Sequence, residues 1–199
     1  MKIIGIHGVA GSGKDTVAGL LRRSHGCAQE SFAKPLYEAL SLMLGIPVSQ
    51  LQDRAQKEEP IEFVDRSPRY LLQTLGTEWG RDLVGYDLWV RLLQRRIERA
   101  EGLIDEFSGF LPAAWVISDV RFEEEAEWVR KHGTLVHLIR DNAAPVIGHV
   151  SELGVEYRDC DMVLSNNGTL DDLRAAVTVL ASDLRLPILY GAQRIEVAE

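Results

Sequence analysis

The residues Gly8-Val9-Ala10-Gly11-Ser12-Gly13-Lys14-Asp15-Thr16 stand between the apolar run 2–7 and a helix-like segment. A glycine-rich turn between a strand and a helix lets successive backbone N–H groups point at phosphate oxygens, at the positive end of the helix dipole. In the pattern GxxxxGK[ST], the lysine reaches the β- and γ-phosphates of a nucleoside triphosphate. The stretch therefore predicts a phosphate-binding loop in which Lys14 holds the triphosphate.

One position departs from that pattern. Asp15 follows the lysine directly, and the hydroxyl comes one residue later, at Thr16. Small-molecule kinases of the nucleoside monophosphate kinase type also place the hydroxyl second after the lysine, so the departure favours a kinase. The alternative is a glycine-rich turn that only joins a strand to a helix, and the flanking pattern together with the Gly-Lys pair argues against it.

Composition is that of an ordinary globular protein. The chain has 199 residues, of which 46% are hydrophobic and 26% charged, which predicts one α/β domain over 1–199. No apolar run approaches the ~20 residues of a membrane span, and the first residues already resemble a core strand, so we expect a cytoplasmic protein. Cys27 and Cys160 lie far apart without metal-ligand neighbours and are expected to be free thiols.

The formal net charge is −8. Binding to polymeric nucleic acid depends on neutralising many phosphates with Lys and Arg, so an acidic chain is not expected to bind it. A small phosphorylated ligand remains compatible, because a cleft can concentrate a few arginines in a molecule that is acidic overall.

Apolar runs with strand character alternate with helical periodicity, which predicts a parallel sheet covered by helices. The strand-like runs are 2–7, 27–31, 113–118, 134–139 and 162–165. The covering helices are expected at 16–23, 122–132 and 170–184, the last with Thr169 as its N-cap after the turn Asn166-Asn167-Gly168.

The stretch 34–105 is a long and mostly helical insertion, which we expect to bind the substrate. Ser67-Pro68 predicts an N-cap and a first helical position. The helix after it carries a polar stripe at i, i+4 spacing, with two glycines that would let a ligand or another backbone approach; a solvated face is the alternative. The stripe consists of Arg69, Gln73, Thr77 and Arg81, and the glycines are Gly76 and Gly80.

Asp119 ends the run Trp115-Val116-Ile117-Ser118-Asp119. Parallel α/β sheets bind their ligands at the carboxyl ends of the strands, so this carboxylate is a candidate ligand for Mg²⁺. Arg121, just beyond it, is a candidate phosphate contact. The alternatives are an N-cap role for Asp119 and a surface ion pair for Arg121.

The segment 140–160 interrupts the α/β alternation and is long enough to act as a lid over the phosphates. Arg140 is its candidate cation for the transferred phosphoryl group. We do not expect His149 to act as a general base, because phosphoryl transfer needs little proton chemistry from the protein.

Several separated blocks resemble, in the same order, the phage-type deoxynucleoside monophosphate kinases. Besides 8–16 they are Ser31-Phe32-Ala33-Lys34-Pro35-Leu36, Gln73-Thr74-Leu75-Gly76-Thr77-Glu78-Trp79-Gly80-Arg81, Ser118-Asp119-Val120-Arg121-Phe122 and His149-Val150-Ser151-Glu152. The resemblance spans nearly the whole chain, ending at 161–168. The block 73–81 and the block that contains Asp119 to Phe122 are more specific than the loop 8–16, which many kinases share.

The resemblance implies a three-layer P-loop kinase fold and transfer of the γ-phosphoryl group of ATP to a deoxynucleoside 5′-monophosphate, with Mg²⁺. Thr16 and Asp119 would serve the metal, and Asp15 would contact a metal-bound water or the acceptor phosphate. Arg121 and Arg140 would neutralise the transferred group. The remaining ATP contacts implied are Gly8, Ala10, Gly11, Ser12, Gly13 and Lys14 at the phosphates, with Asn166 and Gly168 at the adenine.

On the acceptor side, the resemblance implies that two groups of residues grip the monophosphate and its base. They are Ser31, Phe32, Ala33 and Lys34, and then Arg69, Gln73, Gly76, Thr77, Trp79 and Arg81. A homodimer is compatible with the family. If the gene belongs to a phage, the protein would act in the host cytoplasm.

Two other readings stay open from the sequence. A related loop serves kinases of dephospho-coenzyme A, phosphomevalonate or ribonucleotides, and the specific blocks argue against these acceptors. A nucleotide-binding regulatory module that hydrolyses ATP slowly is the alternative from another class, and the substrate-binding insertion argues against it.

Overall fold

The computed structural model describes residues 2–53, 55–107, 111–141 and 154–189. The chain forms two compact units, the first from residues 1–30 and 103–199 and the second from Ser31–Gly102. The prediction of a single domain with an insertion at 34–105 and a lid at 140–160 stays a prediction. His149 and most of the expected lid lie outside the described residues.

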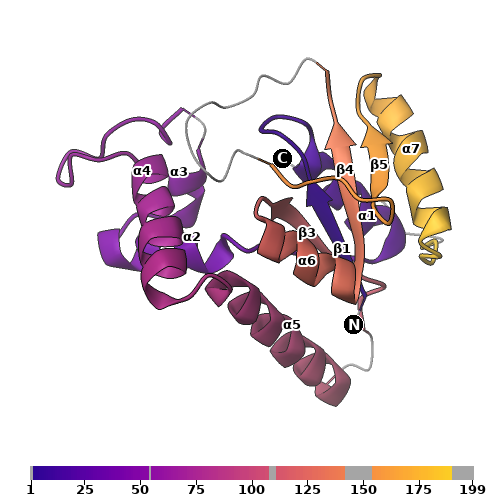
Figure 1. The fold of residues 1–199 in the computed structure, drawn as a ribbon, viewed down its shortest axis with the longest axis horizontal. Coiled ribbons are helices and arrows are strands. Elements are labelled where there is room, and N and C mark those ends of the chain that lie inside the picture. Colours follow the sequence, from indigo (N-terminus) through magenta and orange to yellow (C-terminus); the bar gives the residue numbers. More distant parts are fainter. Residues whose placement is uncertain (1, 54, 108–110, 142–153, 190–199) are drawn as a thin grey trace, which may run out of the picture. The chain divides into compact units, whose positions relative to one another are not determined.

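The first unit contains a five-stranded sheet with all strands parallel (Figure 1). The strand order is β2-β3-β1-β4-β5, so β1, which leads into the glycine-rich loop 8–16, lies at the centre. The predicted parallel α/β architecture is confirmed. The strands are β1 (Ile3–His7), β2 (Ala28–Glu30), β3 (Trp115–Val120), β4 (Gly133–Ile139) and β5 (Met162–Ser165).

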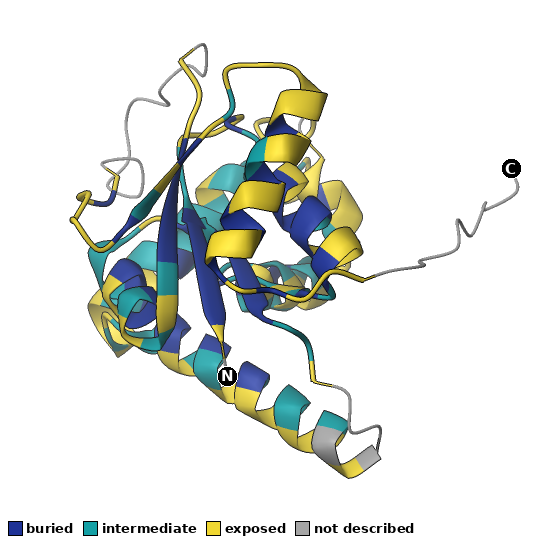
Figure 2. Cartoon of the chain, turned by 90° about the vertical axis from the view of Figure 1, so that its right-hand side faces the viewer, coloured by how far each residue is buried: buried dark blue, intermediate teal, exposed yellow. Residues whose placement is uncertain are grey.

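Helices cover both faces of this sheet. Helices α1 (Lys14–His25) and α7 (Leu170–Asp183) share a buried apolar cluster with alternate strand residues such as Ile4, Ile6 and Val116. Helix α6 (Glu123–His132) packs against β1 and β4 on the opposite face, where a Cβ on Gly5 would lie 2.6 Å from a Val129 methyl. Figure 2 shows the strands largely buried, between helices whose outer faces are exposed. The expected three layers are therefore present.

Local signals define the helix ends. The Thr169 hydroxyl accepts a hydrogen bond from the Asp172 amide at 3.2 Å, which confirms it as the N-cap of α7. Helix α1 ends before Gly26, whose φ of 64° is the left-handed conformation that glycine adopts without strain.

A buried ionic cluster holds residues 154–161 to the sheet. The Asp161 carboxylate accepts from Arg130 at 2.8 and 2.9 Å and lies 3.0 Å from His137 Nε2. Burial alone would raise the pKa of Asp161, but the hydrogen bonds from Arg130 and the Arg158 amide hold it well below its usual range. Asp161 is therefore ionised, and its charge is compensated inside the fold.

The second unit is helical. Its elements are α2 (Lys34–Leu44), α3 (Val48–Gln52), α4 (Pro68–Gln73), the π-helix η1 (Thr74–Val84) and most of α5 (Leu88–Phe107). Ser67 caps α4 by accepting from the Tyr70 amide at 3.3 Å, and Pro68 follows it, as predicted. None of the helices in the described residues is both long and apolar enough to cross a membrane.

The predicted i, i+4 stripe holds only as far as Gln73. From Thr74 the chain forms a π-helix, whose hydrogen bonds run from i to i+5 and shift each later side chain around the axis. The expectation that Thr77 and Arg81 continue the stripe of Arg69 and Gln73 at helical spacing is therefore wrong. Arg81 instead turns back to donate from Nη1 to the Gly76 carbonyl, five residues earlier, at 3.2 Å.

Two glycines of the π-helix admit side chains of the protein itself. A Cβ on Gly80 would lie 2.3 Å from the Trp89 indole, and one on Gly76 would lie 3.3 Å from Leu36. The indole N–H of Trp89 donates to the Gly76 carbonyl at 2.7 Å. The sequence predicted that a ligand or another backbone approaches these glycines, whereas the groups that approach them in the structure are the side chains of Trp89 and Leu36.

Gly80→Ala should destabilise the protein, because its methyl group meets the body of a buried ring; overpacking of this kind costs roughly 1–3 kcal/mol. Gly102→Ala is the matched control, since its Cβ meets no atom within 4 Å in an exposed part of α5. Alanine there should gain about 0.5–1 kcal/mol of helix propensity. Urea unfolding of both variants tests the difference, and equal stabilities would contradict the packing of Trp89 on Gly80.

Candidate functional site

The loop after β1 owes its shape to three glycines. Gly11 and Gly13 have φ angles of 77° and 103°, in the left-handed region. A Cβ on Gly8 would lie 2.6 Å from the Leu138 carbonyl oxygen, and one on Gly13 would lie 2.6 Å from Asn166 Nδ2. The loop is therefore packed against the ends of two strands, and larger residues are excluded from it.

Lys14 closes the loop at the first residue of α1. Its ammonium group donates to the carbonyls of Gly8 at 2.6 Å and Val9 at 2.8 Å, which holds the positive charge within the curl of the backbone. The Ser12 hydroxyl oxygen is buried there without a hydrogen-bond partner in the described residues. A buried polar atom without a partner at a helix N-terminus fits a loop that binds an anion.

The ends of β4 and β5 supply further polar groups to the loop. The Asn166 side chain donates from Nδ2 to the Ser12 carbonyl at 2.7 Å, and the Asn166 backbone N–H donates to the Ile139 carbonyl at 2.8 Å. Arg140, directly after β4, donates from Nη1 to the Gly11 carbonyl at 3.1 Å. The structure therefore brings Arg140 and the turn Asn166–Gly168 to the loop that sequence analysis assigned to phosphate.

Asp15 is tied to two other strands. The Ser118 hydroxyl on β3 donates to Asp15 Oδ1 at 3.1 Å, and Gln29 Nε2 on β2 donates to the Ser118 oxygen at 3.3 Å. No role was predicted for Gln29, and Ser118 was predicted only as the first residue of the block 118–122. Their pairing depends on the strand order and has no signal in local sequence.

Asp119 lies inside β3, one residue before its end. The helix that follows begins at Glu123, and the Glu125 carboxylate caps it by accepting from the amides of Arg121 at 2.8 Å and Phe122 at 3.2 Å. Asp119 is therefore not the N-cap of α6, which removes that alternative. It lies at the carboxyl edge of the sheet, as predicted.

His7, the last residue of β1, is a further residue beside the loop that sequence analysis missed. Its Nδ1 donates to the Val120 carbonyl at 2.9 Å, and its Nε2 accepts from the Val155 amide at 3.4 Å. Burial lowers the pKa of His7, so the ring is neutral and joins β1, β3 and the segment after residue 153.

In the second unit, the predicted acceptor residues differ in environment. Phe32 is buried, whereas Trp79 is exposed. Arg96 donates to the Ser31 carbonyl at 3.0 Å, just before Ala33 and Lys34 start α2. Arg69 forms a salt bridge from Nε to Glu58, and Nη1 and Nη2 of Arg69 have no partner in the described part of the chain.

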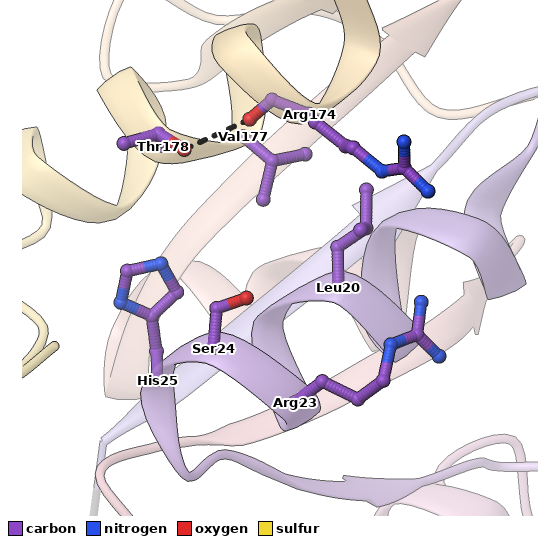
Figure 3. A pocket seen from close by; sticks show the side chains of 7 residues that line it. All are labelled: Leu20, Arg23, Ser24, His25, Arg174, Val177 and Thr178. Atoms are coloured by element: carbon purple, nitrogen blue, oxygen red, sulfur yellow. Dashed lines mark hydrogen bonds between the residues drawn. The ribbon is translucent and has the colours of Figure 1, made fainter. Parts of the chain in front are cut away.

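A separate cavity of about 250 Å³ lies between α1 and α7 (Figure 3). The figure shows Leu20 between the side chains of Arg23 and Arg174, with His25 farther along α1. None of the residues lining it belongs to the loop 8–16. The cavity therefore forms no part of the candidate site.

Similarity to known proteins gives independent evidence about the family of this chain. The model of the family described as deoxynucleotide monophosphate kinase matches residues 48–177. A provisionally named deoxynucleotide monophosphate kinase of Acanthamoeba polyphaga mimivirus is 30% identical over 195 residues, covering 89% of this chain and 94% of the viral protein.

Two phage proteins are also similar to this chain. The deoxynucleoside-5′-monophosphate kinase of Escherichia phage T5 is 29% identical over 65% of this chain and 72% of its own length. The deoxynucleotide monophosphate kinase of Enterobacteria phage T4 is 23% identical over 87% of this chain and 95% of its own length. Together with the loop, these matches show that the chain is a phosphotransferase that belongs to the deoxynucleotide monophosphate kinase family.

Proposed function

We propose that this protein transfers the γ-phosphoryl group of ATP to deoxynucleoside 5′-monophosphates, with Mg²⁺, and releases deoxynucleoside diphosphate and ADP. The observation that carries the proposal is the loop 8–16, closed by Lys14, in a chain that matches the family over residues 48–177. The viral sources of the relatives favour action in the cytoplasm of a host cell.

The first unit is the proposed ATP site. The loop amides and Lys14 would bind the phosphates, and the Asn166–Gly168 turn would lie against the adenine. Arg140 supports this assignment, because it already contacts the loop through the Gly11 carbonyl. Arg121 is proposed as a second cation for the transferred group, where charge develops in the transition state.

Thr16 and Asp119 are proposed to hold Mg²⁺. Their hydroxyl and carboxylate oxygens are the kind of ligand that Mg²⁺ prefers, and this ion keeps several waters and takes few protein ligands. When bound, the ion neutralises charge on the β- and γ-phosphates. Within the described residues, no cluster of three His, Cys, Asp or Glu side chains forms a metal cage, which a nucleotide-bound Mg²⁺ does not need.

The second unit is the proposed acceptor site, and Arg69 is its best-supported residue. Glu58 engages only Nε of the guanidinium, so the fork made by Nη1 and Nη2 remains for a phosphate. Glu58 thus fixes the orientation of the group that would bind the acceptor. Gln73, at the end of the same helix, is proposed to contact the base.

The protein would contribute to the reaction by positioning the two nucleotides and by neutralising charge on the transferred phosphoryl group. Phosphoryl transfer proceeds through a loose transition state with charge spread over the transferred oxygens. Fixed cations stabilise that charge without reorganising, which is the largest contribution an enzyme makes to such reactions. No general base is assigned, because a phosphate acceptor is already ionised at neutral pH.

An assay of ADP release tests the proposed function against two others, a kinase of another acceptor and a regulatory ATPase. ADP release from ATP and Mg²⁺ should be strongly stimulated by deoxynucleoside monophosphates, and chromatography should identify the diphosphate. Activity confined to dephospho-coenzyme A or ribonucleotides would assign another acceptor. Release that is indifferent to every acceptor would identify a regulatory ATPase instead, and either result would overturn the proposal.

Arg69→Ala should raise the KM for the deoxynucleoside monophosphate by about 10- to 100-fold, because a charge-assisted bidentate contact contributes about 1.5–3 kcal/mol. The KM for ATP should not change. Arg66→Ala is the matched control, since Arg66 lies three residues earlier and pairs with exposed Asp65. Equal acceptor kinetics in the two variants would show that the α4 face is merely solvated.

A further inference from the structure

Asp15 is the residue at which this loop departs from the pattern GxxxxGK[ST], and its carboxylate is bound to a neighbouring strand. Its side chain is exposed, yet Oδ1 is held by the Ser118 hydroxyl at 3.1 Å. No described residue bonds to Oδ2. The carboxylate is thus anchored by one oxygen and leaves the other for a ligand.

The hydrogen bonds through Ser118 can run in only one direction. The Ser118 hydroxyl donates to Asp15 Oδ1, so its single proton points at Asp15. Gln29 then presents its NH₂ group to the Ser118 oxygen, at 3.3 Å. The opposite amide orientation would place two acceptors around one proton and leave one of them unsatisfied.

Ser118 is a buried residue of a strand that is paired on both sides. It is 6% exposed and stands on β3, which is paired with β1 on one side and β2 on the other. Asp15 lies between Lys14 and Thr16 in the first turn of α1. A hydroxyl on a central strand therefore holds the exposed carboxylate at the start of α1.

We propose that Ser118 is a positioning residue for phosphoryl transfer: oriented by Gln29, it holds the Asp15 carboxylate through Oδ1 so that Oδ2 can accept from a water of the Mg²⁺ shell. A water bound to a cation is the favoured partner, because a carboxylate and the acceptor phosphate repel each other. This inference rests on the proposed function and adds residues that the resemblance did not assign.

The test compares wild type with Ser118→Ala, Ser118→Thr, Asp15→Asn and the double variant Ser118→Ala/Asp15→Asn. Ser118→Ala should lower kcat ~10-fold or more, with the acceptor KM unchanged, because a hydrogen bond to a charged group is lost. Ser118→Thr keeps the hydroxyl and should restore activity. In the double variant, loss of Ser118 should add nothing to Asp15→Asn.

A second readout does not depend on turnover. Calorimetry with ADP, in the presence and absence of Mg²⁺, measures how much the ion strengthens nucleotide binding. Ser118→Ala should reduce that gain toward the value of Asp15→Asn. If Ser118→Ala unfolds, Gln29→Ala at the exposed β2 position gives the same test, with a loss of about 2- to 5-fold in kcat expected for one neutral hydrogen bond.

Wild-type kcat and Mg²⁺ gain in Ser118→Ala would overturn the inference, and so would losses that multiply in the double variant. Absence of acceptor-stimulated ADP release in the wild type would instead overturn the proposed function. That result would leave the Mg²⁺ gain in ADP binding as an intact measure of Ser118.

Discussion

The loop of residues 8–13 leaves no room for side chains where it meets the ends of β4 and β5, and the site is built on this constraint. Gly8 lies against the Leu138 carbonyl, and Gly13 lies beneath Asn166. The backbone therefore curls closely against these strand ends between β1 and α1. This curl brings the start of α1 and Lys14 to the carboxyl edge of the sheet, where parallel α/β folds bind their ligands.

The sequence was most informative where structure depends on local chemistry. The strands, the loop, the Thr169 and Ser67 caps and the position of Asp119 could all be predicted, because periodicity, capping residues and glycine spacing act within a few residues. The π-helix after Gln73 could not be predicted. An amphipathic pattern indicates which face of a helix is buried, but it does not indicate whether the backbone hydrogen bonds span four residues or five. Trp89, nine residues beyond Gly80, packs into the space that this glycine leaves and donates to the Gly76 carbonyl, and neither contact has a signal in that pattern.

The contacts that refine the site are long-range, which is why sequence analysis missed them. Ser118 meets Asp15 across 103 positions of sequence, and His7 meets Val155 across 148. The first contact follows from the strand order, which places β3 beside β1, and the second joins β1 to a segment outside the strands. By contrast, the pairing of Arg69 with Glu58 spans 11 positions and involves a loop whose path has no periodic signal.

In the proposed function, ATP binds to the first unit through the shape of the loop, and the monophosphate binds to the second unit. The most direct measurement is therefore calorimetric binding of each nucleotide to the Gly13→Ala variant. The added methyl group meets the Asn166 side chain. Alanine would also have to adopt the φ of 103° that Gly13 has, which costs roughly 1–3 kcal/mol. We predict that ATP affinity falls at least tenfold, while the deoxynucleoside monophosphate binds as it does to wild type. A folded variant that binds ATP as tightly as wild type would contradict the account.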